Sequence, residues 1–243
     1  MTRGDAKRFE TTRWSMIVKA GGDHESSQSR RNALDHICRT YWFPAYSYVR
    51  SRGYQQEDAK DLTQEFFARL IEKDFLDAAD RDRGSFRSFL LASIRSFLAD
   101  EWDKTQAKKR GGGIEHQSLD IETAETLLAE SVQKPLTPDQ IFDLHWAKTT
   151  LANALQRVES MYRDAANERQ FIALRPFLGN KDPLTSYAAA AEELAISTGA
   201  VKIAIHRLRK RFREALELEI AETLMDGADL SEELKYLLSR VRL

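Results

Sequence analysis

The stretch from Tyr187 to Phe212 constrains the fold of this chain more than any other, and it reads YAAAAEELAISTGAVKIAIHRLRKRF. Its pattern predicts a short helix ending near Ala195, a tight turn, and a second helix capped by Ser197 or Thr198. Four apolar residues of the second helix recur at helical spacing and form a stripe that we expect to be buried: Val201, Ile205, Leu208 and Phe212. Polar and basic residues lie on the opposite side: Lys202, His206, Arg209, Lys210 and Arg213.

Two helices joined by a tight turn, the second with a basic outer face, are typical of a helix-turn-helix. Such a second helix fits the major groove, where its first turns reach base edges and later cations neutralise phosphates. Between Lys202 and Arg213 there are six lysines or arginines and no acid, although the whole chain has a net charge of −1. The alternative is an ordinary helical hairpin with a solvated basic face.

The composition predicts a folded, mostly helical protein. Only 11 glycines and 5 prolines occur among 243 residues, well below the usual share of about 12 %. Apolar residues make up 42 % and charged residues 31 %, which favours a packed core over disorder. The longest apolar run has five residues, the polar N-terminus lacks a signal-peptide core, and Cys38 is the only cysteine. We therefore expect a cytoplasmic protein.

Residues 30–110 are expected to form a first helical domain, after an N-terminal extension over 1–29. From Glu57 to Lys73 one face is apolar and another is acidic, the acids being Asp58, Asp61, Glu65 and Glu72. A second helix is expected from Arg83 to Asp103 with Ser85 as its N-cap. Its arginines alternate with aromatic residues, of which Phe89 and Phe97 are assigned to the core, while Trp102 fits core or surface equally well.

An acidic stretch without periodicity, residues 111–136, is interpreted as a linker. The sequence Thr137-Pro138-Asp139-Gln140 then forms a capping box and predicts a long helix to about Asp164, at the start of a second domain over 137–219. Residues 220–243 form a C-terminal extension with a short helix from Asp229 to Val241. We expect it to pack on the second domain; the alternative is a regulatory element that covers either domain.

These motifs resemble, in order and spacing, those of bacterial sigma factors of the extracytoplasmic-function (ECF) type in the sigma-70 family. EDAKDLTQEFFARL is similar to region 2.2, GSFRSFLLASIRSFLADEWDK occupies the place of regions 2.3 and 2.4, and Tyr187–Phe212 is similar to region 4. The resemblance spans roughly Arg30 to Glu219. It implies an all-α protein in which a region 2 helical bundle and a region 4 helix-turn-helix are joined by a flexible acidic linker.

The resemblance also implies roles for individual residues. Region 2.2 docks on a coiled coil of the polymerase β′ subunit, and the matching residues are Asp58, Asp61, Gln64 and Glu65. Regions 2.3 and 2.4 recognise and open the −10 element, and the matching residues are Arg83, Arg87, Arg95, Trp102 and Lys104. Region 4 reads the −35 element; we expect Thr198, Gly199, Lys202, Ile203 and His206 near bases, and Arg207, Arg209 and Lys210 near phosphates. At Ala195 the family usually has glycine.

The other residue types point to no catalytic function. The five histidines show no metal-ligand spacing with Cys38, and no phosphate-binding glycine loop is present, so we expect neither an enzyme nor a cofactor nor a metal. The sequence therefore predicts a sigma factor that binds core RNA polymerase, recognises −10 and −35 elements and helps to open DNA. The alternatives are a stand-alone helix-turn-helix regulator and a polymerase-sequestering interaction protein. Two forms of regulation are compatible with this sequence: binding of an anti-sigma factor, and self-regulation by the C-terminal segment.

Overall fold

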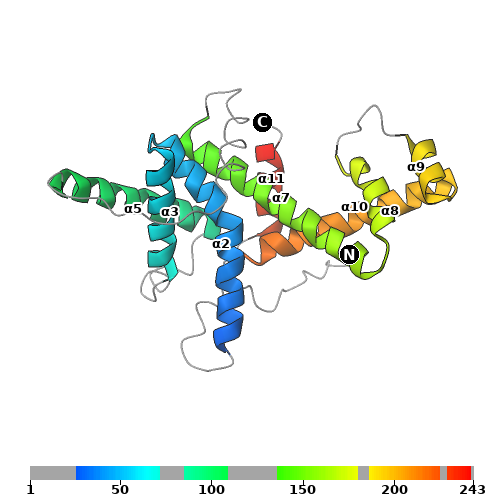
Figure 1. Cartoon of the computed structure of the whole chain (residues 1–243), viewed down its shortest axis with the longest axis horizontal. Coiled ribbons are helices and arrows are strands. Elements are labelled where there is room, and N and C mark those ends of the chain that lie inside the picture. Colours follow the sequence, from blue (N-terminus) through cyan, green and yellow to red (C-terminus); the bar gives the residue numbers. More distant parts are fainter. Residues whose placement is uncertain (1–25, 72–84, 109–135, 180–185, 225–228, 242–243) are drawn as a thin grey trace, which may run out of the picture. The chain divides into compact units, whose positions relative to one another are not determined.

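The computed structural model describes residues 26–71, 85–108, 136–179, 186–224 and 229–241, and all regular elements in these ranges are helices (Figure 1). They are α2 (Ser26–Ser51), α3 (Gln56–Ile71), α5 (Phe86–Lys108), α7 (Pro138–Asp164), α8 (Glu168–Leu174), the 3₁₀ helix η2 (Arg175–Phe177), α9 (Tyr187–Leu194), α10 (Thr198–Ala221) and α11 (Leu230–Val241). The predicted all-α class is confirmed. The predicted linker lies almost entirely outside the described residues, as does most of the N-terminal extension.

The chain divides into two compact units whose borders differ from those of the sequence motifs. The second unit is Thr150–Glu219, and the first contains the residues before and after it. The beginning of α7 and the whole of α11 therefore belong to the first unit. Apolar burial explains the position of α7, because Phe142 and Trp146 are buried there and the ring of Phe142 stacks on that of Tyr41 at 6.5 Å.

Aromatic side chains dominate the core of the first unit. Tyr41 of α2 meets Phe86 of α5 edge to face, with ring centroids 5.2 Å apart. Phe66 of α3 contacts Phe97 of α5 at 5.6 Å, so the assignment of Phe97 to the core is confirmed. Phe89 is half-buried against Phe86. Such ring pairs add to the stabilisation from buried area alone.

The helix starts follow the local signals of the sequence. At α7 the Gln140 amide donates to Thr137 Oγ1 at 3.3 Å, while the Thr137 amide donates to Gln140 Oε1 at 2.9 Å. This reciprocal pair is the predicted capping box. Ser85 caps α5 through a bond from the Ser88 amide, and Asp229 caps α11 through a bond from the Ser231 amide. The predicted end of α7 at Asp164 is also confirmed.

The second unit is built around the end of α7. After α7 the chain turns through Ala166, whose φ is 53°, and the Asn167 amide donates to the Tyr162 carbonyl at 2.8 Å. Tyr162 then packs on Phe171 of α8, and Phe177 of η2 stacks on Tyr187 of α9 with centroids 5.2 Å apart. These contacts support the two helices that follow. Within the described ranges, no helix combines the length and apolar character that a membrane span requires.

A buried histidine makes the stability of the first unit depend on pH. His145 is fully buried with its ring edge against Phe43, and burial together with the charge of Lys148 lowers its pKa from 6.5 to about 4. The unfolded chain therefore binds this proton between about pH 6.5 and 4, whereas the folded chain does not. The stabilising effect is complete above pH 6.5 and is lost as the pH falls towards 4.

We predict that His145→Gln reduces the loss of stability on acidification. Between pH 7 and pH 4.5 the wild type should lose on the order of 2 kcal/mol more unfolding free energy than the variant, from the shift of the histidine pKa. Urea unfolding followed by circular dichroism at both pH values measures this difference. His206→Gln, at an exposed position of α10, is the matched control. Parallel losses in His145→Gln and the wild type would contradict the prediction.

Candidate nucleic-acid interface

The turn between α9 and α10 has the geometry of a helix-turn-helix. Ser186 caps α9 by accepting from the Ala188 amide, and Ser197 caps α10 by accepting from the Ala200 amide at 3.1 Å. Between the helices Ala195 is left-handed, with φ 53° and ψ 42°, and its amide bonds back to α9. Glycine adopts this backbone conformation without strain, and alanine does not. The family preference for glycine at this position thus has a physical cause.

The apolar stripe of α10 lies inside the second unit, as the periodicity predicts. Val201, Ile205 and Leu208 are buried, and Phe212 is half-buried. Burial of this stripe fixes which side of α10 faces solvent. The first three turns therefore present an outer face of six residues, all exposed: Thr198, Gly199, Lys202, Ile203, His206 and Arg207. Ile203 is 55 % exposed, so an apolar side chain lies among the polar groups of this face.

The cations further along α10 differ in whether their side chains are already paired within the protein. Arg209 donates from Nε and Nη2 to the Phe177 carbonyl at 3.1 and 2.8 Å, which satisfies the end of η2. Lys210 lies 3.8 Å from Glu214, and both side chains are largely exposed. Arg207 has no ion pair or hydrogen bond from its side chain within the described part of the chain. Arg207 is thus an exposed cation without a partner in the described part of the chain, whereas Arg209 is bonded to the end of η2.

The acidic face of α3 is on the surface of the first unit. Asp58 and Glu65 are exposed, and Asp61 and Gln64 are half-buried. Glu65 pairs with Arg69, which also donates to Glu101 of α5 at 2.8 Å. On the other side of α3, Thr63 is buried and donates to the Ala59 carbonyl at 2.6 Å. The four residues assigned to polymerase docking therefore share one accessible side of a helix.

The residues assigned to the −10 element do not form a single cluster. Arg83 lies outside the described residues, and Lys104 is within α5 but its side chain is not described. Trp102 is 57 % exposed, so it is a surface residue and not part of the core. Arg95 is exposed on the same helix and pairs with Asp139 of α7. Arg87 lies elsewhere, in the interior of the unit.

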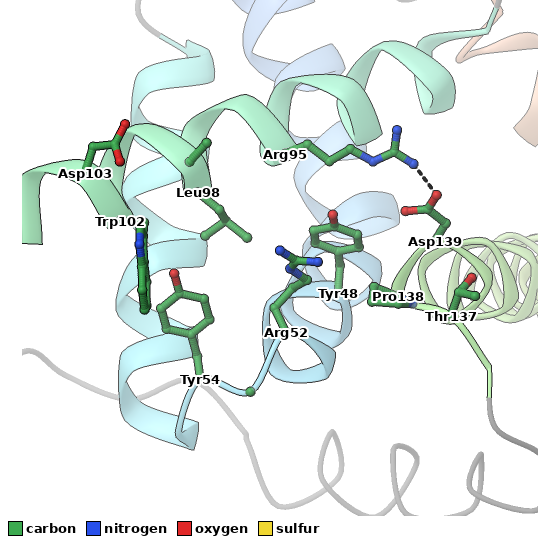
Figure 2. A pocket seen from close by; sticks show the side chains of 12 residues that line it. Tyr48, Arg52, Tyr54, Arg95, Leu98, Trp102, Asp103, Thr137, Pro138 and Asp139 are labelled. Carbon is green, nitrogen blue, oxygen red and sulfur yellow. Dashed lines mark hydrogen bonds and ion pairs between the residues drawn. The ribbon is translucent and has the colours of Figure 1, made fainter. Parts of the chain in front are cut away.

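Trp102 and Arg95 line one hollow of the first unit, shown in Figure 2. The cavity has a volume of about 800 Å³ and lies between the end of α2, the middle of α5 and the start of α7. Tyr48, Arg52 and Tyr54 contribute from α2 and the loop after it, and the Arg95–Asp139 pair lies at one edge. Sequence reasoning did not find Arg52, Tyr54 or Asp139, because only the fold brings them beside Trp102.

Arg87 is buried in a network contributed by three helices. Its Nη1 donates to Asp143 of α7 at 2.6 Å, and its Nε donates to Glu233 of α11 at 2.9 Å. The guanidinium lies over the rings of Tyr236 and Trp146, at 4.1 and 5.1 Å from their centroids. Tyr236 also donates to Asp143, and burial and this bond raise the pKa of the phenol. In this conformation Arg87 is not available to DNA.

The fold and the outer face of α10 define a helix-turn-helix protein of the DNA-binding class. The comparison with protein families identifies it further: the model of the ECF sigma factor family matches residues 44–218. The chain belongs to this family, whose members bind core RNA polymerase and recognise promoters for transcription initiation. Neither the search of curated proteins nor that of solved structures found a match.

The left-handed alanine leads to a test of the turn. Ala195→Gly should raise the free energy of unfolding by about 1 kcal/mol, because glycine removes the strain of the positive φ. Urea unfolding followed by circular dichroism measures the change. Ala200→Gly is the matched control within α10 and should lower stability by about 1 kcal/mol. If both variants were destabilised equally, Ala195 would not be strained in solution.

Proposed function

We propose that this sigma factor contacts the −35 element through the outer face of α10, the −10 element through the hollow beside Trp102, and the β′ coiled coil of core polymerase through the acidic side of α3. The observation that carries this proposal is the division of α10 into a buried apolar stripe and an exposed polar and basic face. Such a protein supplies binding free energy rather than catalysis and acts in the cytoplasm, where the polymerase is.

The first turns of α10 offer the chemistry that base edges require. Lys202 and His206 carry hydrogen-bonding groups, and the exposed methyl groups of Ile203 suit the C5-methyl of thymine. Arg207, one residue further, is placed for a backbone phosphate. We infer that these residues are the −35 reading face, with Thr198, Gly199 and Lys210 at its margins. Arg209 has a supporting role through the Phe177 carbonyl.

Two neighbouring arginines of α10 should therefore behave differently. Arg207→Ala should weaken binding to mixed-sequence duplex DNA and reduce the slope of log affinity against log salt by about 1, because one phosphate contact is lost. Arg209→Ala should leave this slope unchanged and lower the unfolding free energy by about 1 kcal/mol. Fluorescence anisotropy over a salt series and urea unfolding provide the two readouts. Equal salt slopes in both variants would contradict the assignment.

The acidic side of α3 supports the polymerase contact by charge. A row of carboxylates steers a basic partner and favours its association, and the effect is screened by salt. The bonds from Arg69 to Glu65 and Glu101 hold this part of α3 against α5, so the row is presented on a fixed helix. An anti-sigma factor that covered the same row would compete with polymerase for this sigma factor.

Reversing the charge of this row should abolish polymerase binding. Asp61→Lys/Glu65→Lys is expected not to co-elute with core RNA polymerase on gel filtration, whereas the wild type does. The matched control is Asp164→Lys/Glu192→Lys, which makes the same change of net charge at exposed sites of the second unit. If the wild type ignored polymerase and bound duplex DNA alone, a stand-alone helix-turn-helix regulator would replace the sigma assignment.

The hollow beside Trp102 is suited to the unpaired bases of an opened promoter. Opening DNA costs a few kcal/mol for each unstacked base, and aromatic surfaces with nearby cations offset this cost. Trp102 and Tyr54 supply the rings, and Arg52 and Arg95 supply the cations. With about 800 Å³ the cavity has ample volume for a base. We infer that this part of the first unit binds the separated −10 strand.

A further inference from the structure

The network around Arg87 has the composition of a covered nucleic-acid site. The guanidinium meets two carboxylates and two aromatic rings in a buried position. An arginine beside an aromatic face is the combination that binds single-stranded nucleic acid, the cation meeting a phosphate and the ring stacking on a base. Here the place of the phosphate is taken by the carboxylate of Glu233, and the ring of Tyr236 covers the guanidinium.

We propose that Arg87 and Trp146 form a second, cryptic site for single-stranded DNA, and that α11 occupies it as an intramolecular competitor until the strand displaces it. The inference rests on the proposed function, because it assumes that the first unit meets an opened promoter strand. In this proposal α11 is a removable cover of the first unit. The sequence alone instead predicts that this helix packs on the second domain.

When α11 moves away, Arg87 keeps its contacts with α7 and loses those with α11. Asp143 and Trp146 are on α7, so they remain beside Arg87 when α11 moves away. Glu233 and Tyr236 are on α11 and leave with it. The Nε edge of the guanidinium is then free for a phosphate, while Nη1 keeps its bond to Asp143. The Trp146 ring loses its neighbour Tyr236, whose centroid is 6.4 Å away in the covered state.

The attachment of α11 is polar enough to be displaced by a polyanion. Leu237 is its fully buried side chain and Leu230 and Leu234 are half-buried, whereas Leu238 and Val241 are 40 % and 41 % exposed. The apolar side of α11 is therefore only partly removed from water, and its attachment also depends on the polar contacts of Glu233 and Tyr236. The bond between Arg87 and Glu233 is the kind of contact that a phosphate does replace.

The decisive variant is Glu233→Gln in the full-length chain, with Glu232→Gln as its matched control. Glu232 is exposed on the same helix turn. Two quantities are measured: the affinity for a fluorescein-labelled single-stranded oligodeoxythymidine, and hydrogen exchange of the α11 amides. We expect Glu233→Gln to bind the oligonucleotide about tenfold more tightly, because the uncovered state is more populated, and to exchange faster in α11. Glu232→Gln should match the wild type in both.

Arg87 provides the internal check. In Glu233→Gln/Arg87→Ala the gain in affinity should disappear, although α11 still exchanges quickly. Faster exchange in Glu233→Gln without tighter binding would overturn the proposal and make α11 a structural helix. Unchanged exchange would show that Glu233 does not hold α11, and would overturn it as well. Co-elution with core polymerase, measured on the same variants, does not involve this network; its absence in the wild type would overturn the sigma assignment separately.

Discussion

The positive charge of Arg87 is the constraint on which the first unit depends. A guanidinium removed from water must be compensated by nearby carboxylates, and losing one partner of such a set is costly. Asp143 and Glu233 provide the compensation, from 56 and 146 residues further along the chain. This requirement draws the start of α7 and the whole of α11 onto α5. The helices that the motifs assign elsewhere thus become part of the first unit.

Local signals made the helices predictable. The capping box at Thr137 and Gln140 needs only residues three apart, and the stripe from Val201 to Leu208 needs only the helical period. Both features depend only on residues close together in the sequence, so they can be predicted from the sequence alone. The turn at Ala195 is only partly predictable from the sequence. The motif indicates its position, but its left-handed backbone is visible only in the structure.

The burial of charged residues could not be predicted in this way. Arg87 and Arg95 occupy similar sequence surroundings on one helix, yet the first is buried between two carboxylates and the second is exposed beside Asp139. The difference comes from which distant segment covers each position. The same holds for Arg209, whose bond to the Phe177 carbonyl depends on a helix end 32 residues away. Residue type and spacing predict a nucleic-acid site, whereas tertiary contacts decide which of its cations are exposed and which are paired within the fold.

Because α7 belongs to two compact units, the borders of the sequence motifs differ from those of the units. A fragment cut at Thr137, where the motif pattern places a border, would carry Phe142 and Trp146 into water. Each such side chain contributes about 2 kcal/mol or more when buried. The fragment that begins at Thr137 would therefore expose an apolar patch prone to aggregation, and the fragment that ends before it would lack part of its core. The first compact unit instead contains stretches before and after the helix-turn-helix. The helix-turn-helix is therefore inserted, in the sequence, between two parts of one compact unit, so a substitution on its exposed face leaves the core residues of that unit unchanged.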